Sequence, residues 1–435
     1  MIDEPLAAWW RVIANARWFG GKGLSASLEA LTPLPWLTDP GTLPAVRPEV
    51  ATVRYVDGRT EHYVLLVGHT ASPAVGVVAQ VDHEGLGRVS VVDATADPDC
   101  MGALLSALTD PRHAAMEWLD ASAIEPSAEC RVWPGEQSNT TICIGPDRML
   151  KLFRKVEPGR NLDVEVLTAL NGSGVTPEVY GTLLGDLPDG VGRADLGMFV
   201  ERVQNVRDGW EWACAACADD RDISAEAMQL GGALRAVHQR LADVFGTAVV
   251  PGAELAALIG DRLDAAEAQV GELAAVRSSV QVALSALAAT ELVVQRVHGD
   301  FHLGQVLRSA DGWTIIDFEG EPLKTLAERR RPDSVWRDVA GMVRSFDYVR
   351  GAHPEPTSAQ AVAWAATARQ AFLDGYCEEA APDRPVLDAY ELDKAIYEVV
   401  YETRNRPDWV HIPLGAVHNV ARRTTPSPTH NSKEN

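Results

Sequence analysis

Two carboxylates, each placed directly after an apolar segment, are the residues of this sequence best suited to chemistry. Asp300 follows the segment 293–297, and Asp317 follows the segment 313–316, with Gln305 between them. One carboxylate can accept the proton of a reacting hydroxyl. An amide oxygen and a second carboxylate suit Mg²⁺, which prefers oxygen ligands and keeps several waters. The pattern is typical of phosphoryl transfer from a nucleoside triphosphate.

The same segments also predict ordinary β-structure. Residues 293–297 and 313–316 form two strands of an expected hairpin, with Asp311 and Gly312 in its turn. This interpretation is compatible with the first, because strand ends hold functional side chains more rigidly than free loops do.

Candidate nucleotide-binding groups lie earlier in the chain. Ser138, Asn139 and Thr140 stand between two expected strands, 131–133 and 140–144. Backbone N–H groups in such a loop can cover phosphates, although taken alone the segment is only a polar turn.

Lys151 lies within a further apolar strand, 149–153, where a lysine is costly unless it is paired or faces solvent. Glu165, in an expected helix over 162–170, is the favoured partner, with Asp163 and Glu157 as competitors. A strand lysine paired with a helix carboxylate binds the α- and β-phosphates in kinases.

The last expected strand before the helical part of the chain, 197–202, ends in a possible hinge. Backbone N–H and C=O groups of Glu201 and Val203 at such a hinge can read an adenine ring by two hydrogen bonds.

The elements that must hold these residues fall into an α+β order. An amphipathic helix over 5–16 and a hairpin over 53–67 with an Asp-Gly turn begin a β-rich cap, with strands at 74–81 and 88–92. Short helices are expected at 101–108 and 114–118, and long ones at 225–242, 255–287, 359–377 and 387–405. The predicted domains are a cap (1–92), a nucleotide-binding lobe (93–203), a helical catalytic lobe (204–423) and a disordered tail (424–435).

Composition and charge disfavour several classes of partner and compartment. The 435 residues carry a formal net charge of −22, which disfavours nucleic acid. No apolar segment approaches the length of a membrane span, the first residues do not resemble a signal peptide, and six cysteines do not indicate a disulfide framework. We therefore expect a cytoplasmic protein, monomeric or homodimeric, that acts on a small molecule.

The order of these motifs resembles a known family. Ser138-Asn139-Thr140, Lys151, His298-Gly299-Asp300, Gln305 and Asp317-Phe318-Glu319 together are similar to the protein-kinase-like small-molecule kinases, which include the aminoglycoside phosphotransferases. The similarity covers nearly the whole chain and is greatest to the actinobacterial maltokinase-like proteins and, among them, the glucosamine kinases.

The resemblance implies a bilobal protein-kinase-like fold with a cap, ATP and Mg²⁺ as cofactors, and transfer to a sugar hydroxyl. It implies that Asp300 is the catalytic base and that Gln305 and Asp317 hold the metal. Glu319 is expected to reach the metal or to orient a water. His302 would lie close behind the reacting groups, whereas a structural hydrogen bond is the favoured role for His298.

The acceptor site is predicted on a late helix. Glu398 and Glu402, four residues apart, share one helix face, and Trp409 in the following turn can stack on a sugar ring. A solvated acidic face and a core tryptophan are the ordinary alternatives. Arg344 can reach the acceptor or a phosphate, or pair with Asp347.

We expect an ATP-dependent sugar kinase that phosphorylates D-glucosamine, at its primary 6-hydroxyl. A maltokinase that forms maltose 1-phosphate, an aminoglycoside phosphotransferase and a non-catalytic nucleotide-binding scaffold are the alternatives.

Overall fold

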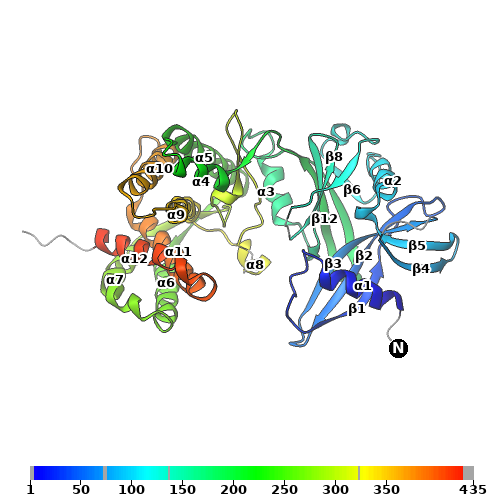
Figure 1. Cartoon of the computed structure of the whole chain (residues 1–435), viewed down its shortest axis with the longest axis horizontal. Helices are drawn as coiled ribbons and strands as arrows, with labels where there is room; N and C mark the ends of the chain where they lie inside the picture. Colours follow the sequence, from blue (N-terminus) through cyan, green and yellow to red (C-terminus); the bar gives the residue numbers. More distant parts are fainter. Residues whose placement is uncertain (1–3, 72–75, 136–137, 322–323, 425–435) are drawn as a thin grey trace, which may run out of the picture. The chain divides into compact units, whose positions relative to one another are not determined.

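The structure is a computed structural model that describes residues 4–71, 76–135, 138–321 and 324–424 (Figure 1). The chain divides into two compact units. The first holds residues up to 204 except 172–176, and the second holds 172–176 with the remainder. The α+β class predicted from the sequence is confirmed. The finer division of the first unit at residue 92 stays a prediction.

The first unit begins with a helix packed on an antiparallel sheet. The strand order is β1-β2-β3-β5-β4, and the predicted Asp-Gly turn joins β2 to β3, with Gly58 at φ +88°. The elements are α1 (Glu4–Asn15), β1 (Ala26–Pro33), β2 (Ala45–Tyr55), β3 (Thr60–Thr70), β4 (Val77–His83) and β5 (Gly87–Asp93).

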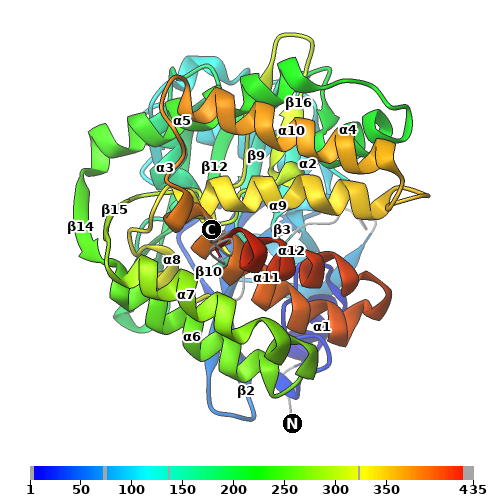
Figure 2. The ribbon, with the colours of Figure 1, turned by 90° about the vertical axis from the view of Figure 1, so that its left-hand side faces the viewer.

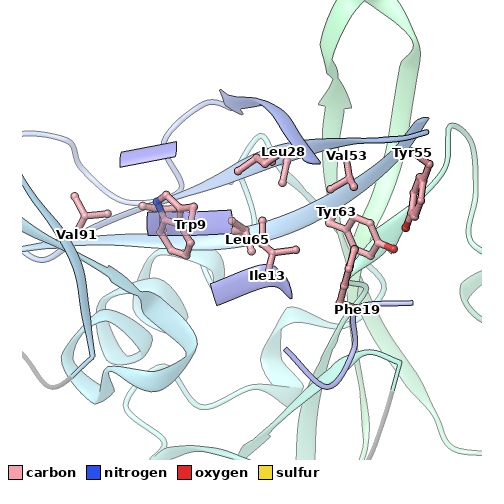
Figure 3. Close-up of a cluster of buried hydrophobic side chains, with 11 residues drawn as sticks. Trp9, Ile13, Phe19, Leu28, Val53, Tyr55, Tyr63, Leu65 and Val91 are labelled. Atoms are coloured by element: carbon pink, nitrogen blue, oxygen red, sulfur yellow. The ribbon is translucent and has the colours of Figure 1, made fainter. Parts of the chain in front are cut away.

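Apolar spacing explains how this helix meets its sheet. Trp9 and Ile13 are four residues apart on α1 and therefore lie on one helical face. Both side chains are buried, as are Val53 and Leu65 of the sheet. Figure 3 shows these side chains gathered between the helix and the strands. Burial of such side chains stabilises the fold by roughly 1.5–3 kcal/mol each.

A second antiparallel sheet completes this unit, in the order β6-β11-β12-β9-β8-β7. Its strands are β6 (Met116–Trp118), β7 (Cys130–Val132), β8 (Thr140–Ile144), β9 (Arg148–Leu152), β11 (Val179–Leu187) and β12 (Gly192–Glu201); the helices are α2 (Pro98–Leu108) and α3 (Leu162–Leu170). The helix expected over 114–118 is wrong, because this segment pairs with β11 as a strand. The short β10 (Lys155–Val156) pairs with β3 and so ties the two sheets together.

The second unit is mainly helical. Helix α10 packs against α5 and α9, and α11 packs against α9, α12 and α6 (Figure 2). The helices are α4 (Gly209–Ala218), α5 (Ser224–Phe245), α6 (Gly252–Glu267), α7 (Arg277–Ala288), α8 (Leu326–Arg329), α9 (Trp336–Ala352), α10 (Ala359–Cys377), α11 (Arg384–Asn405) and α12 (His411–Thr424). The apolar stretch 255–287 is two helices rather than one, since a 3₁₀ segment separates α6 from α7.

Two small sheets frame the carboxylate motifs and correct the predicted hairpin. Strand β15 (Glu291–Gln295) pairs with β14 (Thr247–Pro251), whereas β17 (Trp313–Ile315) pairs with β16 (Val306–Arg308), which also pairs with β13 (Arg207–Asp208). The turn at 311–312 was placed correctly, but it joins β16 to β17. Asp300 and Asp317 therefore follow strands of two different sheets.

Three remaining expectations concern the whole chain. Within the described residues, every helix is too short or too polar to cross a membrane. All six cysteines are free thiols. The predicted disordered tail lies outside the described residues, apart from Thr424 at the end of α12.

Candidate active site

The loop that carries Asp300 is held by a buried carboxylate on α9. Asp338 is fully buried, and its two oxygens accept the backbone N–H groups of His298 at 2.8 Å and Gly299 at 2.9 Å. His238 donates from Nε2 to the same carboxylate at 2.9 Å. Gly299 has φ +85°, a conformation that glycine adopts without strain. These bonds fix the backbone immediately before Asp300.

His298 has the structural role favoured from the sequence. Its Nε2 donates to the carbonyl oxygen of Ile316 at 3.0 Å, and its Nδ1 accepts the N–H of Asp300 at 3.4 Å. The ring thus joins the loop before Asp300 to the segment before Asp317. This connection keeps the two carboxylate motifs in register with each other.

Asp300 itself is held only loosely. The nearest described charges are Nζ of Lys394, 3.9 Å from Oδ1, and Nε2 of His302, 4.0 Å from Oδ2. Both distances exceed a hydrogen bond. The carboxylate is therefore available to a ligand, as a proton acceptor must be.

His302 is an uncharged neighbour of this carboxylate at neutral pH. Burial lowers its pKa and Lys394 adds to the shift, although the charge of Asp300 opposes them. Its Nδ1 accepts the N–H of Gly304 at 3.0 Å, so Nε2 carries the proton and faces Asp300.

Gln305 and Asp317 meet as a pair suited to a metal ion. Gln305 Nε2 lies 3.2 Å from Asp317 Oδ2, and rotation of the amide by half a turn presents its oxygen instead. Asp317 has φ +65°, a strained conformation for a residue other than glycine. This hard-oxygen set fits Mg²⁺. Glu319, two residues on, is half-buried and stays a predicted ligand.

A cavity of about 630 Å³ opens beside Asp300 within the helical unit. Its volume lies within the ~300–1,000 Å³ range of small-molecule sites. All six residues predicted to lie at the acceptor or close behind it line this cavity: Asp300, His302, Arg344, Glu398, Glu402 and Trp409. The structure thus brings together residues that the sequence spreads over three segments.

Charged side chains line the cavity as five pairs. The pairs are Lys394–Asp300, Arg337–Glu321, Arg262–Asp393, Arg344–Glu398 and Arg406–Glu402. The last four have N–O distances between 2.5 and 3.0 Å. The lining is therefore balanced in charge, unlike the acidic chain as a whole.

The two glutamates predicted on α11 differ in availability. Both oxygens of the buried Glu402 are occupied, by Arg406 and by the hydroxyl of Tyr348. Glu398 accepts both bonds from Arg344 on Oε2, so that within the described chain its Oε1 has no hydrogen-bond donor. Of the two, Glu398 is better placed to receive a new donor.

Arg344 and Trp409 have structural partners besides lining the cavity. Arg344 pairs with Asp347 at 2.9 Å as well as with Glu398, so the predicted pairing with Asp347 is confirmed. Burial alone would lower the pKa of Arg344, but these two carboxylates raise it. Trp409 stacks on Tyr348, with ring centroids 6.2 Å apart, which steadies one wall of the cavity.

In the first unit, Lys151 pairs with Asp163, which the sequence offered as a competitor of the favoured Glu165. Nζ of Lys151 lies 2.7 Å from Asp163 Oδ2, and the Asp163 side chain is almost fully buried. The N-cap Asn161 accepts the N–H of Asp163 at 2.8 Å and so fixes the start of α3. The competitor named from the sequence is thus a direct partner, and a role for Glu165 stays a prediction.

The predicted phosphate loop is anchored by a buried arginine. Arg154 donates to Thr140 Oγ1 at 2.7 Å and to the Val64 carbonyl oxygen of β3 at 3.1 Å, and its backbone N–H donates to Asn139 at 3.4 Å. Arg154 is 1% exposed. The side chains of Asn139 and Thr140 therefore hold the loop, while Ser138 is exposed and residues 136–137 lie outside the described chain.

Replacing Thr140 by Val should destabilise the first unit by about 1–3 kcal/mol, because the buried Nε–H of Arg154 loses its acceptor. Urea unfolding measures this change. Thr60→Val is the matched control at an exposed site and should stay within about 0.5 kcal/mol of the wild type. Equal losses in both variants would show that the Arg154 bond contributes nothing.

The predicted hinge lies where the chain passes from the first unit to the second. Glu201 ends β12, and its N–H donates to Glu178 at 2.8 Å. The N–H of Arg202 donates to Asp147 at 2.9 Å. Adenine reading by Glu201 and Val203 stays a prediction.

Sequence reasoning missed several residues of the site. Lys394 and Arg262 line the cavity, and Asp338 positions the loop before Asp300. The sequence held a signal for Arg262 and Asp338, since a charged residue among apolar residues of a helix needs a partner. Which partners they take depends on packing between helices that are distant in sequence.

Family models match most of the chain. The model of the phosphotransferase enzyme family matches residues 129–390, and the model of the maltokinase N-terminal cap domain matches residues 13–97. These spans contain Lys151, Asp300, Gln305 and Asp317.

Curated relatives are similar over about two thirds of this chain. A glucosamine kinase of Streptacidiphilus jiangxiensis is 29% identical over 318 residues, which is 64% of this chain and 70% of the relative. A glucosamine kinase of Mycolicibacterium smegmatis is 27% identical over 314 residues, 65% of this chain and 77% of the relative.

Among solved structures, a glucosamine kinase in complex with glucosamine, ADP and inorganic phosphate matches with a TM-score of 0.68 and 23% identity. The match covers 95% of this chain and 99% of that one. At this identity the comparison confirms the fold expected from the sequence, a kinase-like architecture with an N-terminal cap.

Proposed function

Because the chain belongs to the phosphotransferase enzyme family, we propose that it is an ATP-dependent sugar kinase that converts D-glucosamine to glucosamine 6-phosphate. The single observation that carries the proposal is the position of Asp300. This carboxylate lines a small-molecule cavity, and His298 bonds its loop to the segment before Asp317, which together with Gln305 suits Mg²⁺.

The chain's own residues supply positioning and proton acceptance. Asp300 orients the acceptor hydroxyl and takes its proton, while Asp338 and His298 keep the loop in place. Gln305 and Asp317 would hold the metal, and Lys151 would contact the phosphates. Bound Mg²⁺ supplies neutralisation of the phosphate charge during transfer.

Glu398 is better placed than Glu402 to bind the protonated amine of glucosamine. Glu398 retains an open oxygen and an 18% exposed side chain, whereas Glu402 is 1% exposed and fully bonded. A protonated amine bound at Glu398 Oε1 forms a charge-assisted hydrogen bond. Arg344 keeps Asp347 as a second partner, so the new bond does not leave it unpaired.

Replacing Glu398 by Gln should raise KM for glucosamine about 10–100-fold, because a hydrogen bond to a charged group contributes roughly 1.5–3 kcal/mol. KM for ATP should change little. Steady-state kinetics with glucosamine and with glucose, its neutral counterpart, measures the effect. Equal loss for both sugars would contradict an amine site at Glu398.

The function itself is tested with a panel of sugars and ATP, scored by ADP release, followed by NMR of the product. Glucosamine should be the preferred acceptor and its 6-hydroxyl the site of phosphorylation. Maltose is the second candidate, since the N-terminal cap matches the maltokinase cap model and the cavity has room for a disaccharide. No transfer to any sugar would end the proposal.

A further inference from the structure

Lys394 differs from the other cations of the cavity. Four of the five charge pairs are within hydrogen-bond distance, whereas the Nζ of Lys394 lies 3.9 Å from Asp300 Oδ1. Within the described chain, Lys394 makes no hydrogen bond through its ammonium group. Of the five lining cations described, it is therefore the one with all of its donors open to a ligand.

The fold brings Lys394 to this position through a close approach of two helices to the Asp300 loop. Gly341 of α9 faces Lys394 of α11, and a Cβ at Gly341 would lie 2.4 Å from the carbonyl oxygen of Phe301 and 3.0 Å from Lys394 Nζ. Any larger residue would displace the loop or the ammonium group. The glycine thus leaves room for a cation directly beside Asp300.

From this arrangement we propose that Lys394 is a specificity-determining residue. Its ammonium group donates to an acceptor oxygen beside Asp300 and repels the acceptor's own ammonium group from that position. The inference rests on the proposed function. It explains which hydroxyl reacts, because the positive charge of Lys394 repels an ammonium group brought next to it.

The consequence for glucosamine follows from its chemistry. The amine at C2 is adjacent to the hydroxyls at C1 and C3, so presenting either to Asp300 would bring the ammonium group towards Lys394. The 6-hydroxyl lies across the ring, and its presentation leaves the amine free to reach Glu398. The bond changes are those of any kinase: the hydroxyl oxygen bonds to the γ-phosphorus, ADP leaves and Asp300 takes the proton.

The experiment compares Lys394→Gln, Lys394→Arg and Lys155→Gln. Lys155 is a matched control, an exposed lysine of the first unit that pairs with Glu61 at 2.7 Å and does not line the cavity. Each variant is measured for kcat and KM with glucosamine and glucose. Calorimetry without nucleotide gives the affinity for each sugar, and NMR identifies the phosphorylated hydroxyl.

For Lys394→Gln we expect roughly tenfold weaker binding of glucose, from loss of a charged donor, and a smaller loss for glucosamine, because a repulsion is removed as well. Products phosphorylated at C1 or C3 should appear with glucosamine. Lys394→Arg should restore the wild-type pattern, and Lys155→Gln should not differ from it.

Two results would overturn the inference: an unchanged glucose-to-glucosamine ratio with 6-phosphate as the sole product, or equal losses for both sugars that Arg fails to restore. Either leaves the kinase proposal intact provided that the wild type phosphorylates glucosamine. A wild type that phosphorylates neither sugar refutes the proposed function itself.

Discussion

Replacing Asp300 by Asn should lower kcat by about 10²–10⁴-fold, the usual contribution of a positioned proton acceptor. Asparagine preserves the shape of the side chain but cannot accept the proton of the acceptor hydroxyl. Nucleotide affinity should stay close to wild type, because Lys151 and the Gln305–Asp317 pair are unchanged. Coupled measurement of ADP release gives kcat, and calorimetry gives the nucleotide affinity.

The structure predicts that the Asp300→Asn variant folds normally, so that its loss of turnover is not due to misfolding. Within the described chain, the Asp300 carboxylate makes no hydrogen bond, and its nearest charged neighbours lie at 3.9 and 4.0 Å. Its replacement should therefore shift unfolding free energy by less than about 1 kcal/mol. A variant with wild-type turnover would remove Asp300 from the reaction, and one that unfolds easily would assign it a structural role.

The part of the site that sequence reasoning located lies within short motifs. Asp300, Gln305 and Asp317 fall within one stretch, where apolar segments and turn residues indicate their surroundings. The long helices and the β-rich cap followed from periodicity, because burial of one face dictates the spacing of apolar residues.

The features that the sequence did not predict depend on contacts between elements that are distant in the chain. Residues 116–118 form a strand because β11 lies beside them, and the strand before Asp300 pairs with β14 instead of with the strand before Asp317. Lys394 meets Asp300 from a distant helix. Local sequence does not encode such partners, since they are chosen by the packing of whole elements.

A second large effect is expected at Asp338, whose carboxylate holds the loop that carries Asp300. Its replacement by Asn puts an amide NH₂ against one of the N–H donors that now meet a carboxylate, from His298, Gly299 and His238. A buried donor left without an acceptor costs about 1–3 kcal/mol, so we expect a loss of that size by urea unfolding at pH 7. Turnover should also fall on the order of 10²-fold, because the Asp300 loop is displaced.

The pH dependence of that stability loss identifies its cause. Burial by itself would raise the pKa of Asp338, but the hydrogen bonds from His238 and from the N–H of Gly299 hold it below its ordinary value. A carboxyl group whose pKa is lowered by folding stabilises the fold above its unfolded pKa of about 3.9 and ceases to do so as pH falls through the folded value. The difference between wild type and Asp338→Asn should therefore be constant from about pH 5 to 8 and shrink only below about pH 4. A difference that disappears near pH 6 would instead assign the effect to a histidine.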